Sequence, residues 1–422
     1  MTTQKKPLHE DWIAVILAFT AILLICLGLR PSMPKFDWNN GDSLVAKLTD
    51  LSNLGKMGSL YLWVLGALII AFLLGGKKIT FQLATGLLAI MAISMFAQVI
   101  TGNAWVKDLG IEIVLFSLLL GLFISNVLGV PAWLRAVLQT ELFIKTGLVL
   151  LGSGIIFQEL VKGGGLGVLQ SVVVVFTVWY FTFWLCKQFK LDDEFRMMIS
   201  SAVSICGVSA AIATSGAIEG DNKKLSHVIS LVLIVAIPMM IFMPYVARWM
   251  NMPPEVAGAW LGGTIDTSGA VVAAGTMLGE EALKYATLVK FSQNVLLGIA
   301  AFLISVWWTY SKKETNQPKP GLRTIWDRFP KFVLGFILVS LLFSFVLSPA
   351  FVKEIKGNIK DLQTCFFAIA FACIGLETKF TDIFKMENGR PAMAFIIAQV
   401  FNILVTLGMA YLVFGGLFGG ES

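Results

Sequence analysis

The stretch LSHVISLVLIVAIPMMIFMPYV, which runs from Leu225 to Val246, contains no Asp, Glu, Lys or Arg. A helical run of about 20 apolar residues crosses the hydrocarbon core of a bilayer. Comparable runs recur along the whole chain, which is 57% hydrophobic and 14% charged. Backbone polar groups in lipid must be satisfied within a helix or by a closed β-barrel. The strands of a barrel alternate apolar and polar residues, whereas these runs are long and continuously apolar, which favours helices. The sequence therefore predicts an all-α membrane protein.

The apolar runs predict about eleven transmembrane helices, which together form one integral membrane domain. We expect residues 1–110 to form N-terminal scaffold helices and residues 111–422 to form a transporter core. The predicted spans are Trp12–Leu29, Leu60–Gly75, Thr80–Val99, Ile111–Val130, Leu142–Phe157, Leu166–Cys186, Leu225–Val246, Ala282–Tyr310, Phe332–Leu347, Leu362–Leu376 and Pro391–Phe418.

The net charge of +6 comes from basic residues scattered through short loops, without aromatic residues between them. This pattern argues against a nucleic-acid partner and indicates that Lys and Arg orient the helices in the bilayer. By the positive-inside rule, Lys5 and Lys6 place the N-terminus in the cytoplasm. We therefore expect a multi-pass protein of the bacterial inner membrane, surrounded by lipid, for which a homodimer is one assembly to test.

The five cysteines have no CxxC spacing, and the chain has only two histidines, His9 and His227. Neither a disulfide framework nor a metal site built from Cys and His is expected from this pattern. No cofactor is predicted.

Two apolar segments, 198–218 and 256–278, flank the Leu225–Val246 run and are poor as ordinary spans because they are rich in glycine and hydroxyl residues. Both contain Thr-Ser-Gly-Ala. Glycine weakens a helix, and non-helical backbone at membrane depth survives only where protein or a water-filled cavity satisfies it. The sequence predicts two interrupted helices that either cross or re-enter the membrane. Their cores read SSAVSICGVSAAIATSGA (200–217) and GAWLGGTIDTSGAVVAAG (258–275).

A half-helix that starts inside the membrane directs free N–H groups and the positive end of its dipole at the space before it, which suits a small anion. Small residues of this kind also pack membrane helices tightly, so packing is the alternative interpretation. Asp266 favours a functional site, because a carboxylate in an apolar segment is costly. A water-exposed position at the end of a span is the alternative for Asp266.

The long run after the second segment carries a polar stripe. Lys290, Gln293 and Asn294 follow one another at i, i+3 and i+4 and so share a helix face. We predict that Asp266 binds the coupling ion, which is either H⁺ or Na⁺. Apart from this Na⁺, no metal ion is predicted. The candidate substrate-binding residues are Cys206, Gly207, Ser209, Thr214, Ser215, Thr264, Thr267, Ser268, Lys290, Gln293 and Asn294.

A weak internal repeat aligns Gly152–Lys162 with Gly375–Lys385, with a matched phenylalanine, acid and lysine. An odd number of predicted helices separates the two copies, so they would have opposite orientation. Inverted repeats of this kind are common in secondary transporters. Convergent chemistry at helix ends is the alternative explanation.

Several stretches resemble the YeiH-like family of sulfate exporters, which is grouped with the bile acid, arsenite and riboflavin transporter superfamily. The resemblance covers the chain from about residue 110 to its end. It implies inverted repeats, broken helices that cross near the membrane midplane, alternating access through a moving core, and a small oxyanion substrate such as sulfate or sulfite. The matching stretches are Thr146–Gly152, Ile205–Ala211, Val271–Gly275, Leu288–Lys290 and Ile374–Phe380.

The chain departs from the family pattern inside the predicted site. It reads Asp266-Thr-Ser-Gly-Ala270 where the family usually reads His-Glu-Val-Ala-Gln, and it has Gln293 where the family commonly has a basic residue. The leading hypothesis is a secondary active transporter of a small anion that works by elevator-like alternating access. The alternative is a Na⁺-coupled symporter of an organic carboxylate or amino acid. An enzyme is not expected, because no GxSxG or HExxH motif occurs.

Overall fold

The computed structural model describes residues 8–108, 113–135, 137–155, 157–311, 326, 329–378 and 389–416. The elements assigned in these residues are helices. One isolated β-bridge also occurs, between Trp38 and Asn103. Internal contacts divide the chain into two compact units. Unit 1 comprises Met1–Phe157 and Lys331–Lys379, and unit 2 comprises Gln158–Pro330 and Phe380–Ser422. The prediction of an all-α membrane protein is confirmed.

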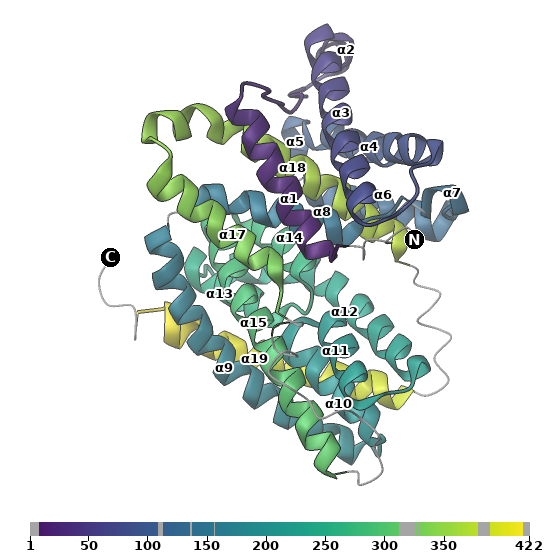
Figure 1. Ribbon diagram of the computed structural model, residues 1–422, viewed down its shortest axis with the longest axis vertical. Helices are drawn as coiled ribbons and strands as arrows, with labels where there is room; N and C mark the ends of the chain where they lie inside the picture. Colours follow the sequence, from purple (N-terminus) through teal and green to yellow (C-terminus); the bar gives the residue numbers. More distant parts are fainter. Residues whose placement is uncertain are drawn as a thin grey trace, which may run out of the picture. The chain divides into compact units, whose positions relative to one another are not determined.

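Unit 1 contains ten α-helices and three short helical turns in its described residues, of which α3, α4 and α18 are the long apolar helices (Figure 1). Their bounds are α1 Glu10–Cys26, α2 Gly41–Thr49, α3 Leu51–Leu74, α4 Phe81–Thr101, α5 Ala104–Asp108, α6 Ile113–Phe123, η1 Ile124–Leu128, α7 Ala132–Arg135, α8 Thr140–Leu151, η2 Gly152–Gly154, α17 Lys331–Leu341, η4 Leu342–Val346 and α18 Pro349–Glu377.

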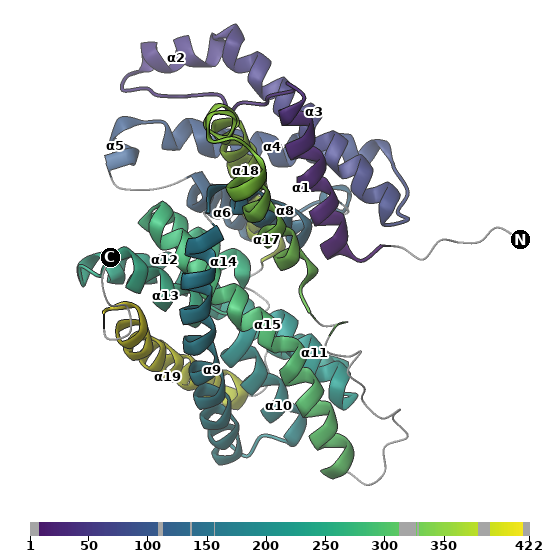
Figure 2. The same cartoon turned by 60° about the vertical axis from the view of Figure 1, so that its left-hand side comes forward.

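In its described residues, unit 2 contains four long apolar helices, α9, α12, α15 and α19, four shorter helices arranged as two interrupted pairs, and one π-helical turn (Figure 2). Their bounds are α9 Phe157–Gln188, α10 Asp193–Ser201, η3 Ala202–Cys206, α11 Val208–Ile218, α12 Asn222–Trp249, α13 Pro254–Thr264, α14 Ser268–Leu278, α15 Glu280–Ser311 and α19 Gly389–Phe414. Both segments predicted to be interrupted are therefore interrupted.

Seven described helices are long and apolar enough to cross a membrane, and each overlaps a predicted span, although α3 and α18 begin well before the predicted starts at Leu60 and Leu362. The other four predicted spans correspond to shorter helices. Trp12–Leu29 is the 17-residue helix α1, while Ile111–Val130, Leu142–Phe157 and Phe332–Leu347 correspond to α6, α8 and α17, each followed by a short π- or 3₁₀-helical turn. Hydropathy alone does not distinguish a continuous α-helix from one that continues as a π-helical or 3₁₀-helical turn.

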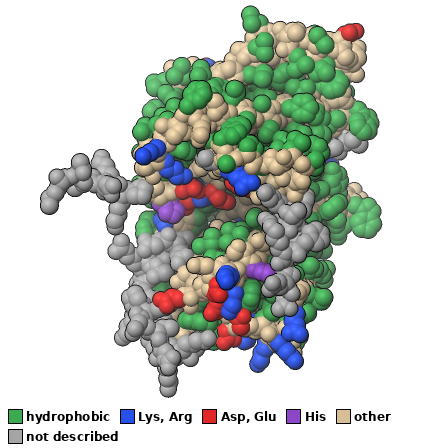
Figure 3. Space-filling view, turned by 90° about the vertical axis from the view of Figure 1, so that its right-hand side faces the viewer, with side chains coloured by type: hydrophobic (Ala, Val, Ile, Leu, Met, Phe, Trp, Pro, Cys, Tyr) green, Lys and Arg blue, Asp and Glu red, His purple; other side chains and the backbone are tan. Residues whose placement is uncertain are grey.

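Large apolar side chains lie on the surface of many of these helices, as expected for helices that face lipid. Leu62, Phe176 and Leu404, for example, are 66%, 51% and 61% exposed. On the face shown in Figure 3, hydrophobic side chains cover wide areas and charged side chains gather in a few groups. This distribution agrees with a multi-pass membrane protein.

Internal contacts divide the first part of the chain at Phe157, while the functional division expected near residue 110 stays a prediction. The helices after residue 110, α6 and α8, pack against α18 and α1 and therefore belong to unit 1. The α6–α18 contact is close because it is built on glycine. A Cβ atom added at Gly121 would lie 2.5 Å from the Ala372 carbonyl oxygen, and one added at Gly375 would lie 2.4 Å from that of Leu118.

The predicted internal repeat stays a prediction. Its second copy extends over residues 379–385, which lie outside the described residues.

A cluster of charged side chains joins the starts of α1, α8 and α17 within unit 1. The Lys145 ammonium lies 2.8 Å from a Glu10 carboxylate oxygen, 3.0 Å from one of Asp11 and 3.7 Å from one of Glu141. Asp11 is buried, and its other carboxylate oxygen accepts a 2.9 Å hydrogen bond from the Lys331 amide. Removing the lysine would leave a buried carboxylate without its cation.

We expect Lys145→Met to lower the free energy of unfolding by about 2 kcal/mol, because breaking one side of a largely buried ion pair strands the other charge. Chemical or thermal unfolding of the purified protein measures this loss. Lys356→Met, at an exposed position on α18, is the matched control and should be nearly neutral. Equal stability of the two variants would contradict a structural role for the cluster.

Candidate functional site

The first interruption lies at Gly207, between the π-helical turn η3 and α11. Gly207 has φ +58° and ψ −111°, a conformation open to glycine and strained for other residues. A Cβ atom at this position would lie 2.6 Å from Cγ1 of Val232. Both the backbone conformation and the close packing therefore require glycine here.

The second interruption separates α13 from α14. Residues Ile265 and Thr267 are extended, with ψ 128° and 139°, so the chain crosses the gap in a short stretch that holds Asp266. Thr267 caps α14, since its hydroxyl accepts a 3.3 Å hydrogen bond from the Ala270 amide. Asp266 is only 1% exposed.

The two interruptions touch each other. A Cβ atom added to Gly207 would lie 3.0 Å from the backbone oxygen of Asp266 and 3.1 Å from its Cβ. Four helix ends therefore meet inside unit 2: the carboxyl ends of η3 and α13, and the amino ends of α11 and α14. We call this place the crossing, defined by residues 203–209 and 263–268. Within the described chain, no side chain caps the amino end of α11.

Helix α15 supplies hydrogen-bond donors to the crossing and packs beside α11 and α14 (Figures 1 and 2). The Lys290 ammonium donates to the Ile205 carbonyl at 2.9 Å and to Gln293 Oε1 at 2.9 Å. Gln293 Nε2 donates to the Gly263 carbonyl at 2.9 Å. A positive charge at the carboxyl end of a helix is favourable, and these bonds satisfy carbonyls that the interruption leaves open.

Helix α19 supplies a second set of donors, which the sequence analysis did not identify. Gln399 Nε2 donates to the Thr264 carbonyl at 2.8 Å. Asn402 Nδ2 donates to the carbonyls of Val203 and Thr264 at 3.1 and 3.3 Å, and its Oδ1 accepts a 2.8 Å bond from the Thr406 hydroxyl. The signal was present, because these three residues follow a helical spacing of i, i+3 and i+7 in an apolar run.

Part of the glycine content of the second segment serves packing. Gly258 and Gly262, four residues apart, face α15. A Cβ atom at either would lie 2.3 Å from a backbone oxygen, that of Ala282 or Ala286 respectively. This is the close approach of small residues typical of packed membrane helices. The packing interpretation is therefore correct for these two glycines, while Gly207 serves the interruption itself.

The crossing brings together most of the predicted site residues. Two residues of the prediction, Thr214 and Ser215, lie in the later turns of α11, about 10 Å along the helix from Gly207, and do not join this group. Ser209 is exposed, and Thr267 and Ser268 are half-buried, so these three hydroxyls are the most accessible. The predicted site residues that lie at the crossing, or that are bonded to it from α15, are Cys206, Gly207, Ser209, Thr264, Asp266, Thr267, Ser268, Lys290, Gln293 and Asn294.

Lys290→Met is expected to lower the free energy of unfolding by about 2 kcal/mol, because it leaves the buried Ile205 carbonyl and Gln293 Oε1 without their donor. Thermal unfolding in detergent measures the change. The control is Lys223→Met at an exposed position near the start of α12. If both variants unfold like the unsubstituted chain, the ammonium does not hold the crossing together.

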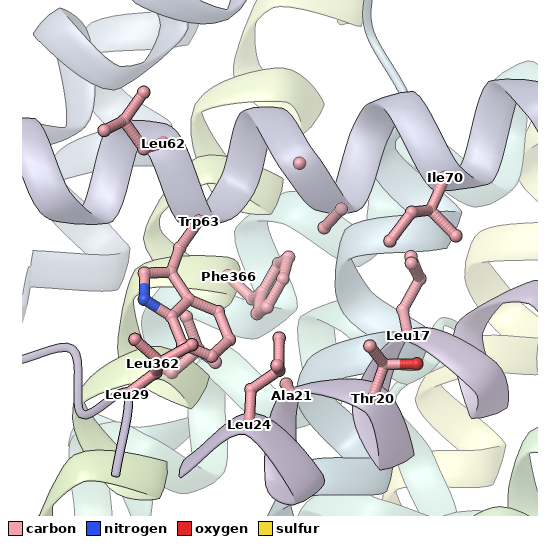
Figure 4. A pocket seen from close by; sticks show the side chains of 12 residues that line it. Leu17, Thr20, Ala21, Leu24, Leu29, Leu62, Trp63, Ile70, Leu362 and Phe366 are labelled. Carbon is pink, nitrogen blue, oxygen red and sulfur yellow. The ribbon is translucent and has the colours of Figure 1, made fainter. Parts of the chain in front are cut away.

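A pocket elsewhere in the chain does not suit a charged substrate. In unit 1, α1, α3 and α18 enclose a cavity of about 280 Å³ (Figure 4). Its lining is apolar, with side chains such as Leu17, Leu362 and Phe366, and its polar side-chain atoms are the Thr20 hydroxyl and the Trp63 indole nitrogen. This cavity is therefore a poor site for a charged substrate.

The fold and the crossing together define a multi-pass α-helical membrane protein with two interrupted helices in contact. The chain belongs to the family described as conserved hypothetical protein 698, whose family model matches residues 85–395. The resemblance to the YeiH-like family is thereby confirmed at the level of the family.

Several relatives carry the name UPF0324 membrane protein. One from Rhodopirellula baltica is 41% identical over 78% of this chain and 62% of its own length. One from Nitratidesulfovibrio vulgaris is 37% identical over 78% of this chain and 59% of its own length. One from Nitrosomonas europaea is 31% identical over 75% of this chain and 72% of its own length. The chain thus spans about 60% of the length of the first two relatives. No solved structure matches it.

Proposed function

We propose that this chain is a secondary active transporter of a small anion, with a sulfate- or sulfite-like oxyanion as the substrate class. The observation that carries the proposal is the contact between two interrupted helices at Gly207 and Asp266, deep in unit 2. Interrupted helices are costly in a membrane and are typical of the substrate and ion sites of transporters. Alternating access would move this crossing from one side of the membrane to the other in an elevator-like motion.

The charge distribution at the crossing favours an anion. The amino ends of α11 and α14 begin there, and their first N–H groups and dipoles attract negative charge. Ser209, Thr267 and Ser268 are accessible and could add hydroxyl donors. The Lys290 ammonium, bonded to the Ile205 carbonyl, adds a positive charge to the same site.

The driving force in this proposal is an ion gradient or exchange, since the sequence has no GxxxxGK[ST] nucleotide-binding loop. Asp266 is the proposed site of the coupling H⁺ or Na⁺. We propose that the protein transports its substrate without converting it, and that it lies in the bacterial inner membrane with its N-terminus in the cytoplasm.

A Na⁺-coupled symporter of an organic carboxylate or amino acid is the second candidate. The observation in its favour is Asp266, a buried carboxylate two residues after Thr264, whose carbonyl bonds to the Gln399 amide; carboxylate, hydroxyl and amide oxygens are the ligands that hard cations prefer. The two candidates differ in the substrate that exchanges across the membrane, which is an oxyanion for the first and an organic carboxylate or amino acid for the second.

Counterflow in proteoliposomes tests the proposal. Vesicles loaded with unlabelled sulfate, sulfite, succinate or an amino acid are diluted into radiolabelled sulfate, and uptake is followed in time. The proposal expects saturable uptake that is stimulated by an internal oxyanion. Stimulation by an organic acid, with its own labelled flux, would support the second candidate, and flux that neither saturates nor responds to the internal anion would indicate a channel.

A further inference from the structure

Four buried oxygen atoms, in the second interruption or on side chains bonded to its residues, have no hydrogen-bond partner within the described residues: Thr264 Oγ1, Asp266 Oδ2, Asn294 Oδ1 and Gln399 Oε1. Their side chains are 1%, 1%, 5% and 2% exposed. Buried polar atoms in native proteins nearly always have a partner, and an isolated carboxylate oxygen is the most costly to leave alone. The carboxylate and amide oxygens can only accept hydrogen bonds, so together with the Thr264 hydroxyl they suit a cation or a hydrogen-bond donor.

The four oxygens come from three elements that meet at the end of α13. Thr264 and Asp266 lie on either side of Ile265 in the bend itself. Gln399 reaches the bend from α19, where its Nε2 donates to the Thr264 carbonyl at 2.8 Å. Because a carbonyl can only accept, this bond fixes the orientation of the amide and leaves Oε1 as the open atom. Asn294 reaches the bend from α15, with a 3.1 Å bond between its Nδ2 and the Ser268 hydroxyl.

We infer that these four oxygens bind one Na⁺ ion. The inference rests on the proposed function and deepens it, because it names the coupling ion and its ligands. One carboxylate, one hydroxyl and two amide oxygens form an oxygen-only ligand set, which hard cations prefer over soft metals. Gln399 is a new member of the site, and Thr264 and Asn294 change from substrate ligands to ion ligands.

Charge balance selects a monovalent cation. The crossing holds one carboxylate, Asp266, and one ammonium, Lys290, both 1% exposed. Before an anion binds, a bound Na⁺ leaves one excess positive charge at the crossing, which favours an oxyanion at the amino ends of α11 and α14. A divalent cation would leave two excess charges in a region closed to water, which is far more costly. Binding of Na⁺ therefore prepares the site for the anion, and this is the coupling.

Thermal unfolding of the purified full chain tests Na⁺ binding without reference to transport. NaCl replaces choline chloride at constant ionic strength, and KCl serves as a parallel series. We expect Na⁺ to raise Tm by about 5 °C along a saturable curve, while K⁺ has little effect, because a ligand that binds only the folded state stabilises it by mass action. Equilibrium binding of radioactive Na⁺ should give about one ion per chain.

Thr264→Val is the sharpest variant, because it keeps the shape of the side chain and removes an oxygen that has no partner. We expect its Tm in choline to stay the same and its Na⁺ midpoint to rise at least about tenfold. Asp266→Asn should abolish the Na⁺ response. Thr276→Val is the matched control on α14: it removes a hydroxyl that bonds to the Val272 carbonyl of its own helix and no open oxygen, so its Na⁺ midpoint should stay within about threefold.

Identical Tm curves in NaCl, KCl and choline chloride would overturn the inference, as would a Tm that responds to pH but not to Na⁺, which would assign Asp266 to a proton. An unchanged Na⁺ midpoint in Thr264→Val and Asp266→Asn would also overturn it. These results are independent of the counterflow assay. Oxyanion counterflow without a Na⁺ response would retain the proposed function and reject the ion site. A Na⁺ response without oxyanion counterflow would retain the ion site and reject the proposed substrate.

Discussion

Asp266→Asn is expected to abolish gradient-driven accumulation of the anion while leaving the protein folded. Asparagine has nearly the shape of aspartate but no charge, so it removes the group that would carry the coupling cation. Because Oδ2 of Asp266 has no partner among the described residues, the substitution breaks no hydrogen bond at that atom. Burial of a carboxylate is costly, but the substitution also leaves the buried Lys290 ammonium without the carboxylate at the crossing. We therefore expect the variant to stay folded with a small decrease in Tm.

Accumulation in proteoliposomes, measured under an imposed Na⁺ or H⁺ gradient, checks this expectation. The flux that depends on the gradient should fall at least about tenfold, because the variant has no carboxylate to carry the coupling cation. Glu255→Gln, in the first turn of α13, is the control and should retain accumulation. A variant at Asp266 that accumulates the anion fully would remove this carboxylate from the coupling mechanism.

Gly207→Val is expected to displace the crossing and to stop transport. The φ of +58° is unfavourable for a β-branched residue. The new Cβ would also lie 2.6 Å from Val232 Cγ1 and 3.0 Å from the Asp266 backbone oxygen. Strain and overpacking together should cost on the order of 3 kcal/mol. The two interruptions cannot both keep their positions, so the variant should lose stability and counterflow together.

The control for this variant is Gly408→Val, because a Cβ at Gly408 of α19 meets no atom within 4 Å. Thermal unfolding and counterflow are measured on both variants in parallel. A second variant, Gly207→Ala combined with Val232→Ala, removes the closest clash and should recover part of the stability lost in Gly207→Ala alone. If Gly207→Val unfolds and transports like the control, the close contact between the two interruptions is not required.

Local patterns predicted the helices and both interruptions, because long apolar runs and clusters of glycine with hydroxyl residues carry their signal within about 20 residues. The polar stripe of Lys290, Gln293 and Asn294 was likewise readable from helical spacing, and the structure places it against the interrupted segments.

The partners of these side chains could not be predicted from local patterns. Asn402 bonds to Val203 and Thr264, which are 199 and 138 residues away in sequence. Lys145 bonds to Glu10 across 135 residues. A single sequence shows which residues are polar but not which distant backbone group each one satisfies, and this is also why the contact between Gly207 and Asp266 was not foreseen.

The most direct test of the crossing as a transport site is sulfate counterflow measured side by side for the unsubstituted chain, Gly207→Val and Gly408→Val at equal protein content in the vesicles. We predict saturable flux, stimulated by internal oxyanion, for the unsubstituted chain and Gly408→Val, and background flux for Gly207→Val. Equal flux in all three proteins would contradict the assignment of transport to the crossing.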